Sequence, residues 1–234
     1  MPATLELVDP AQQGFLWGRN GAKHTLDINS FFYEGVVKKL ERFVFFLDTA
    51  KAFDSIDHAW IFKVLKRAAF PPWVSNFVRC SLTEVLVSPF FGTLSDVWIP
   101  ILRGVKQGCP LSPLLFIIAY DPLITFLTSI PNVQPFAFAD DLAIATASLP
   151  AISPALALIN SFSYLSGLGI NKNKSCVVSS LPPSRLDPVR SYLLTCPWPD
   201  LTLANSATHL GIPIGRDTTL ECVFSSPYNK LSPG

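Results

Sequence analysis

The chain has 234 residues, enough for one large domain or two small ones with a substantial core. Apolar residues make up 49% of the chain and charged residues 15%, which is the composition of a globular protein. The formal net charge is +1, so the chain lacks the overall positive charge that would by itself indicate binding to nucleic acid. The five cysteines include no Cys-x-x-Cys pair, so neither a disulfide framework nor a zinc site is indicated. The longest lipid-like run, residues 114–120, is too short to span a membrane, and the first residues lack a secretory signal pattern. We therefore expect an intracellular protein without membrane contact.

Residues 43–47 form a continuous apolar run that is followed at once by Asp48. Such a run predicts a strand that is buried on both faces and ends in a carboxylate. Apolar residues then recur at helical spacing over residues 60–68, with Asp57 as the expected N-cap and Pro71-Pro72 as the stop. Pro72 is expected to begin a second helix.

Residues 85–91 and 93–101 predict a hairpin around Gly92. The dipeptide Ser112-Pro113 predicts the start of a buried helix that ends near residue 128. Ser153-Pro154 predicts another helix, which ends at Gly167. Together with the apolar strands, these elements predict an α+β fold whose sheet is covered by helices on one face.

Asp140 and Asp141 stand in the middle of an apolar stretch, residues 136–145, which predicts two short strands with the acidic pair at the turn between them. Two ionised groups in apolar surroundings need a positive partner. The nearest basic residues in the sequence are Lys106 and Lys172, so a bound cation is the simplest partner. Ordinary turn chemistry is the alternative, because aspartate is common in hairpin turns.

Asp48 is the expected third ligand if its strand lies beside this hairpin. Carboxylate oxygens suit Mg²⁺, which takes waters and substrate phosphates as its remaining ligands. Two such ions about 4 Å apart hold the attacking and leaving oxygens of a phosphoryl transfer in line. The three aspartates therefore predict a metal-dependent phosphoryl-transfer site.

Six segments, covering roughly residues 10 to 215, resemble motifs of the reverse transcriptases of non-LTR (LINE-like) retrotransposons in order and spacing. Phe-Leu-Asp48-Thr-Ala-Lys51-Ala-Phe53-Asp54 resembles motif A, residues 103–116 resemble motif B, and Phe138-Ala-Asp140-Asp141 resembles motif C. The remaining likenesses are those of residues 13–19 to a fingers motif, residues 167–175 to motif D and residues 209–214 to the primer grip, motif E.

The resemblance implies a polymerase-like palm, an antiparallel sheet with helices on one face, together with partial fingers. The expected divisions are partial fingers at 1–42, a palm at 43–215 with a fingers insertion at about 70–105, and a short C-terminal tail at 216–234. That tail is too short for the helical thumb of the family, so we expect the thumb to be absent.

The resemblance also implies roles for individual residues. Asp48, Asp140 and Asp141 would be catalytic ligands of two Mg²⁺ ions, with Mn²⁺ as a possible substitute, and Lys174 would protonate the pyrophosphate leaving group. Phe53 would be a steric gate against the ribose 2′-hydroxyl, Gln107 and Gly108 would line the dNTP and template pocket, and Arg19 would contact phosphate. The primer grip would consist of His209, Leu210 and Gly211.

Several of these residues also have an ordinary structural interpretation. Phe53 could be a core aromatic, Lys174 a turn lysine and Arg19 an exposed side chain, while Gln107 and Gly108 could belong to a loop that leads into a helix.

The resemblance as a whole implies an RNA-directed DNA polymerase whose partners are an RNA template, a DNA primer and dNTPs. One alternative is a truncated, inactive retroelement remnant that at most binds nucleic acid. A second is an RNA-dependent RNA polymerase, but that class usually shows Gly-Asp-Asp where this chain has Ala139-Asp140-Asp141, and an acid where Phe53 stands.

Overall fold

The computed structural model describes residues 7–83, 85–88, 97–216 and 218. These residues form an α+β fold on a five-stranded sheet with the order β4-β5-β1-β6-β7. The strands are β1 (Phe43–Leu47), β4 (Gln134–Phe138), β5 (Asp141–Thr146), β6 (Cys176–Ser179) and β7 (Thr202–Ala204). The predicted tail at 216–234 lies almost entirely outside the described residues.

The sheet is mixed, so the prediction of an antiparallel sheet is wrong at one edge. The pairs β4–β5, β5–β1 and β1–β6 are antiparallel, whereas β7 runs parallel to β6. The reason is the connection: helix α8 (Asp187–Leu193) lies between β6 and β7 and carries the chain back to the end of the sheet where β6 began.

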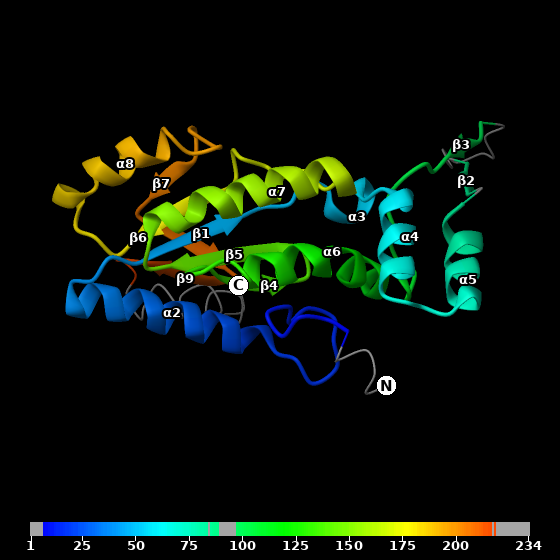
Figure 1. Ribbon diagram of the computed structural model, residues 1–234, viewed down its shortest axis with the longest axis horizontal. Helices are drawn as coiled ribbons and strands as arrows, with labels where there is room; N and C mark the ends of the chain where they lie inside the picture. Colours follow the sequence, from blue (N-terminus) through cyan, green and yellow to red (C-terminus); the bar gives the residue numbers. More distant parts are fainter. Residues whose placement is uncertain (1–6, 84, 89–96, 217, 219–234) are drawn as a thin grey trace, which may run out of the picture.

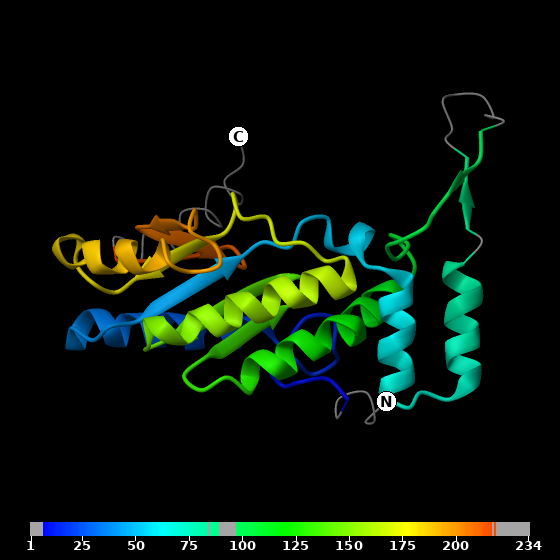
Figure 2. The same ribbon diagram turned by 45° about the horizontal axis from the view of Figure 1, so that its top comes forward.

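Helices cover both faces of the sheet, which corrects the prediction of one covered face (Figure 1, Figure 2). Helices α6 (Ser112–Thr128) and α7 (Ile152–Ser166) pack on one face, against Phe45 and Ile144. Helix α2 (Gly21–Lys38) packs on the other face, where Phe32 contacts the layer that contains Val44. Because strand β1 is apolar on both sides, each face of the sheet must be shielded from water.

The elements that follow β1 match the predicted order with small shifts at their starts. Helix α4 (His58–Arg67) follows the short helix α3 (Ala52–Ser55), and α5 (Pro72–Leu82) begins at its proline.

The ends of these helices match the predicted positions closely. Asp57 occupies the N-cap position of α4 but makes no capping bond with its side chain, which lies 4.0 Å from Arg103 Nε instead. Leu111, one residue before the predicted Ser112, occupies the N-cap position of α6. Gly167 ends α7 in a left-handed conformation, as predicted.

Helices α4 and α5 lie side by side at one end of the sheet, across the ends of α6 and α7 (Figure 2). The predicted hairpin beyond α5 is confirmed as two short antiparallel strands, β2 (Leu86–Val87) and β3 (Ile99–Pro100). Its predicted turn at Gly92 lies outside the described residues. No helix in the described part of the chain is long and apolar enough to cross a membrane.

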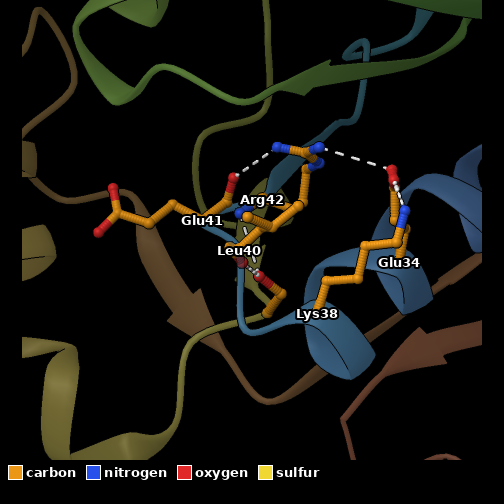
Figure 3. A network of polar contacts seen from close by, with 6 residues as sticks. Glu34, Lys38, Leu40, Glu41 and Arg42 are labelled. Atoms are coloured by element: carbon orange, nitrogen blue, oxygen red, sulfur yellow. Dashed lines mark hydrogen bonds and ion pairs between the residues drawn. The ribbon is translucent and has the colours of Figure 1, made fainter.

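A separate antiparallel pair, β8 (Ser206–His209) and β9 (Ile212–Gly215), packs on the same face of the sheet as α2. A polar network fixes the nearby connection between α2 and β1 (Figure 3). Arg42 donates to the Glu41 carbonyl at 3.2 Å and pairs with Glu34 at 3.5 Å, while Lys38 pairs with Glu34 at 2.8 Å. The backbone N–H of Arg42 donates to Ser180 Oγ, so the start of β1 is tied to the end of β6.

Candidate active site

The structure brings Asp48 to the acidic turn, as the sequence predicts. Strands β1 and β5 are antiparallel with Leu47 opposite Leu142, so the next pair along the two chains is Asp48 and Asp141. Residues that are directly opposite in such a pair carry their side chains on the same face of the sheet. Asp140 lies one step further along, where the Thr49 hydroxyl donates to its carbonyl oxygen at 3.1 Å. The three aspartates therefore lie at the same end of the central strands, close enough for their charges to interact.

The electrostatics of this group are those of uncompensated negative charge. Burial raises the pKa of Asp140, and the charge of Asp48 raises it further. Burial also raises the pKa of Asp141, with additional contributions from the charges of Asp140 and Asp48. None of the ion pairs within the described residues includes any of the three aspartates. A cation at this position would relieve their mutual repulsion.

The donor set fits a hard divalent cation that keeps some of its own ligands. The described residues contain no group of three or more His, Cys, Asp or Glu side chains that could together hold a metal ion. Mg²⁺ is commonly held by one or two carboxylates and completes its shell with water and substrate phosphates. The arrangement therefore fits a site that is completed by substrate, and it does not fit a closed structural metal site.

Phe53, Gln107 and Gly108 lie on one cavity of about 450 Å³. The Phe53 ring stacks on Phe116, with 4.7 Å between ring centroids, and meets the edge of Phe15 at 6.2 Å. Gly108 has a φ of +81°, and no atom lies within 4 Å of the position of a Cβ there, so its backbone is open to the cavity. Phe15 also lines this cavity, although the sequence pattern did not single it out. Its position in the fingers motif, next to Gly14, was the available signal.

Lys174 is exposed in the loop that precedes β6, and that loop is bonded to the backbone of Asp48. The N–H of Asn171 donates to the Asp48 carbonyl at 2.8 Å, and the N–H of Asp48 donates to Ser175 Oγ at 3.1 Å. The loop with Lys174 is thus anchored beside the carboxylates, while the proton-donor role of this lysine stays a prediction.

The Arg19 guanidinium is largely engaged within the protein. It donates to the carbonyl oxygens of Val8, Asp9 and Gln12 at 2.8, 2.7 and 2.5 Å. Burial lowers its pKa, which the charges of Asp121 and Asp9 partly offset. These bonds hold residues 8–12 in a compact loop, and the predicted phosphate contact stays untested.

His209 is the last residue of β8, and Leu210 and Gly211 form the turn that leads into β9. The primer-grip role of these three residues stays a prediction. Leu210 and Gly211 both have positive φ, 49° and 82°, which is the pattern of a two-residue hairpin turn. The Leu210 side chain packs close to Gly21 at the start of α2, where the Phe138 ring also lies. The turn is thereby connected to β4, the strand that leads into Asp140.

Acidification is expected to destabilise the protein through His209, whose buried Nε2 has no hydrogen-bond partner among the described residues. Burial lowers the pKa of His209 to about 4, and the neighbouring His24 contributes in the same direction. An exposed imidazole has a pKa of about 6.5, so between these values the unfolded chain binds a proton that the folded chain does not. The free energy of unfolding should therefore fall by up to about 3 kcal/mol as pH drops from 6.5 to 4.

Urea unfolding of the wild type and of His209→Phe at several pH values measures this effect. Asp140 and Asp141, whose pKa values are raised, act in the opposite direction, so the informative quantity is the difference between the two proteins. Parallel pH profiles would show that His209 is not the titrating group.

The chain is similar in sequence to known proteins over most of its length. The family model "Reverse transcriptase (RNA-dependent DNA polymerase)" matches residues 2–214. A Pol polyprotein from the type-1 retrotransposable element R2 of Popillia japonica is 31% identical over 189 residues, which are 76% of this chain and 26% of that protein. The type-2 element R2DM of Drosophila melanogaster encodes a Pol polyprotein that is 28% identical, with 96% of this chain and 22% of that protein covered.

Solved structures show the same fold at low identity. Telomerase from Candida albicans, in complex with a fragment of telomeric RNA, aligns with a TM-score of 0.61 at 13% identity, covering 84% of this chain and 33% of that one. Apo telomerase from Candida tropicalis aligns with a TM-score of 0.60 at 13% identity, covering 91% and 36%. The chain spans about a quarter of the length of the two Pol polyproteins. It belongs to the reverse transcriptase family and is related to the Pol proteins of non-LTR retrotransposons.

Proposed function

We propose that this chain is the palm region of an RNA-directed DNA polymerase that adds dNMP units to a DNA primer on an RNA template. The observation that carries the proposal is that Asp48, Asp140 and Asp141 lie at one end of the central strands and interact electrostatically, without an ion-pair partner in the described part of the chain. Within this family, such a group is best explained as the site of nucleotidyl transfer.

Asp48 and Asp140 would hold two Mg²⁺ ions, with Asp141 as a supporting ligand, and Mn²⁺ prefers the same oxygen donors. When bound, the ions stabilise negative charge on the phosphates during in-line attack of the primer 3′-hydroxyl on the α-phosphate. The 3′-oxygen forms a bond to the α-phosphorus as the hydroxyl proton passes to water and the bond between the α-phosphorus and pyrophosphate breaks. The protein contributes mainly positioning and charge stabilisation, as in other phosphoryl transfers.

The cavity lined by Phe53, Gln107 and Gly108 would receive the incoming dNTP. The Phe53 ring, which stacks on Phe116, is part of its apolar lining, and the open backbone at Gly108 also lines it. Lys174, on the loop anchored to Asp48, would donate the proton that the pyrophosphate leaving group takes up.

The substitution Phe53→Ala is expected to raise ribonucleotide incorporation relative to deoxynucleotide by at least about tenfold, because it removes the ring that would meet a 2′-hydroxyl. Primer extension with matched dNTP and rNTP series measures the ratio. Phe62→Ala serves as the control, since Phe62 contacts Arg79 and does not line this cavity. If the wild type and Phe53→Ala discriminate equally between dNTPs and rNTPs, Phe53 is not the steric gate.

The proposed function is tested by extension of a labelled DNA primer on an RNA template in Mg²⁺, with EDTA and a DNA template of the same sequence as comparisons. We expect elongation on RNA that EDTA abolishes. Binding of the primed RNA without elongation would support the alternative of an inactive remnant.

A further inference from the structure

Gln12 is fully buried, and its carboxamide bonds to the backbone of the acidic turn. Its Nε2 donates to the Ala139 carbonyl at 3.0 Å, and its Oε1 accepts from the Ala139 N–H at 2.9 Å. The same oxygen accepts from the N–H of Gly14 at 2.8 Å. One side chain therefore satisfies both backbone polar groups of the residue directly before Asp140.

Ala139 has a reason to need this support. Its φ is +55°, a left-handed conformation that is unfavourable for a residue with a Cβ. Strained backbone of this kind persists only where the surroundings hold it in place, and it concentrates at functional sites. Because Ala139 is buried, water cannot replace the two bonds that Gln12 supplies.

Residues 8–19, here called the N-terminal strap, place Gln12 against the turn. The strap pairs with β4, since the Gln13 N–H donates to the Ala137 carbonyl and the Ala137 N–H donates to the Ala11 carbonyl, both at 2.8 Å. Gly14 lies so close to the turn that a Cβ there would be 2.2 Å from the Ala139 nitrogen. Arg19 closes the strap through its bonds to carbonyl oxygens within it.

We propose that Gln12 is a positioning residue, which fixes the Ala139 turn so that Asp140 and Asp141 face Asp48 and share a divalent cation with it. The consequence for DNA synthesis rests on the function proposed above, whereas the consequence for cation binding does not. Gln12 touches no reacting atom and acts through the backbone groups of Ala139 and Gly14 that it holds.

The test compares Gln12→Met with Gln13→Met. Gln13 is a matched control on the same strap, because its side chain also bonds to backbone groups, donating to the Pro10 carbonyl and accepting from the Asn20 N–H, but within the described residues it makes no hydrogen bond to the acidic turn. Methionine keeps the length of the side chain and removes its polar groups. Binding of Mn²⁺ is measured by electron paramagnetic resonance, and thermal unfolding is recorded for each protein.

We expect Gln12→Met to bind Mn²⁺ on the order of tenfold more weakly than the wild type, the scale of effect of residues that orient metal ligands. Gln13→Met should bind like the wild type. Failure of the wild type to bind Mn²⁺, or equal affinity in the two variants, would overturn the proposal.

A second measurement needs no variant and guards against failure of Gln12→Met to fold. Hydrogen exchange of the wild type should show protected amides at Ala139 and Gly14, although both lie outside helices and strands. Rapid hydrogen exchange at the Ala139 amide would contradict the proposed hydrogen bond from this amide to Gln12. If the exchange and Mn²⁺ results hold while the wild type extends no primer, Gln12 keeps its positioning role and the proposed polymerase function fails.

Discussion

Replacing Asp140 with asparagine is expected to reduce primer extension at least about a thousandfold while leaving the fold intact. The loss follows from removing a charged ligand that contributes several kcal/mol of charge stabilisation in the transition state, where about 1.4 kcal/mol corresponds to tenfold in rate. Stability should not fall, because burial raises the pKa of Asp140 and the charge is unfavourable in the free protein. Single-turnover extension and thermal unfolding measure the two properties.

Asp187→Asn provides the control for charge removal. Asp187 lies at the start of α8 with its side chain 86% exposed, and its one ion pair among the described residues is with Arg190, three residues along the helix. Extension by this variant should match the wild type. An Asp140→Asn protein that retains more than about a tenth of the wild-type rate would place the catalytic carboxylates elsewhere.

Replacing Phe116 with alanine is expected to lower the free energy of unfolding by about 3–5 kcal/mol, the usual cost of removing a buried aromatic ring. Phe116 is fully buried in α6 and stacks between Phe53 and Tyr120, with ring centroids 4.7 and 5.4 Å away. The substitution would leave a cavity and also release the Phe53 ring. Urea unfolding at neutral pH measures the change.

Phe126→Ala is the matched control, on the same helix but 59% exposed. Its effect should stay within about 0.5 kcal/mol, as for most surface substitutions. Equal effects of the two substitutions would show that the aromatic stack does not support the core.

The parts of the fold that the sequence predicts well are those with one dominant pattern. Strand β1 is an unbroken apolar run, and the acidic turn interrupts a second one, so both could be placed before any contact was known. The helix starts at Pro72 and near Ser112 follow from proline geometry at the first turn.

Other parts depend on contacts that no local pattern records. Helix α2 buries His24, Thr25 and Gly35 but exposes Leu26 and Val37, so its apolar residues do not form a clean stripe. The covered second face of the sheet was missed for that reason. The parallel strand β7 is likewise determined by where the crossover through α8 returns.

The candidate site likewise contains residues that the sequence predicts and residues whose placement depends on distant contacts. Asp48 and Asp140 could be paired from their places at strand ends, because only the register had to be assumed. Gln12 could not, because a glutamine in a polar segment gives no sign that it will be buried against Ala139, 127 residues away. The burial of His209 follows from its packing on Phe46 and could not be predicted from the sequence either.

The most direct measurement is the stoichiometry of one nucleotide addition by the purified chain. The purified chain is mixed with oligo(dT) annealed to poly(rA), dTTP and Mg²⁺. The mass of the primer is then measured by mass spectrometry, and the released pyrophosphate is quantified in parallel. The proposed function predicts a primer longer by whole dTMP units, with one pyrophosphate released for each unit. Folded protein that binds the primed RNA yet yields neither product would contradict it.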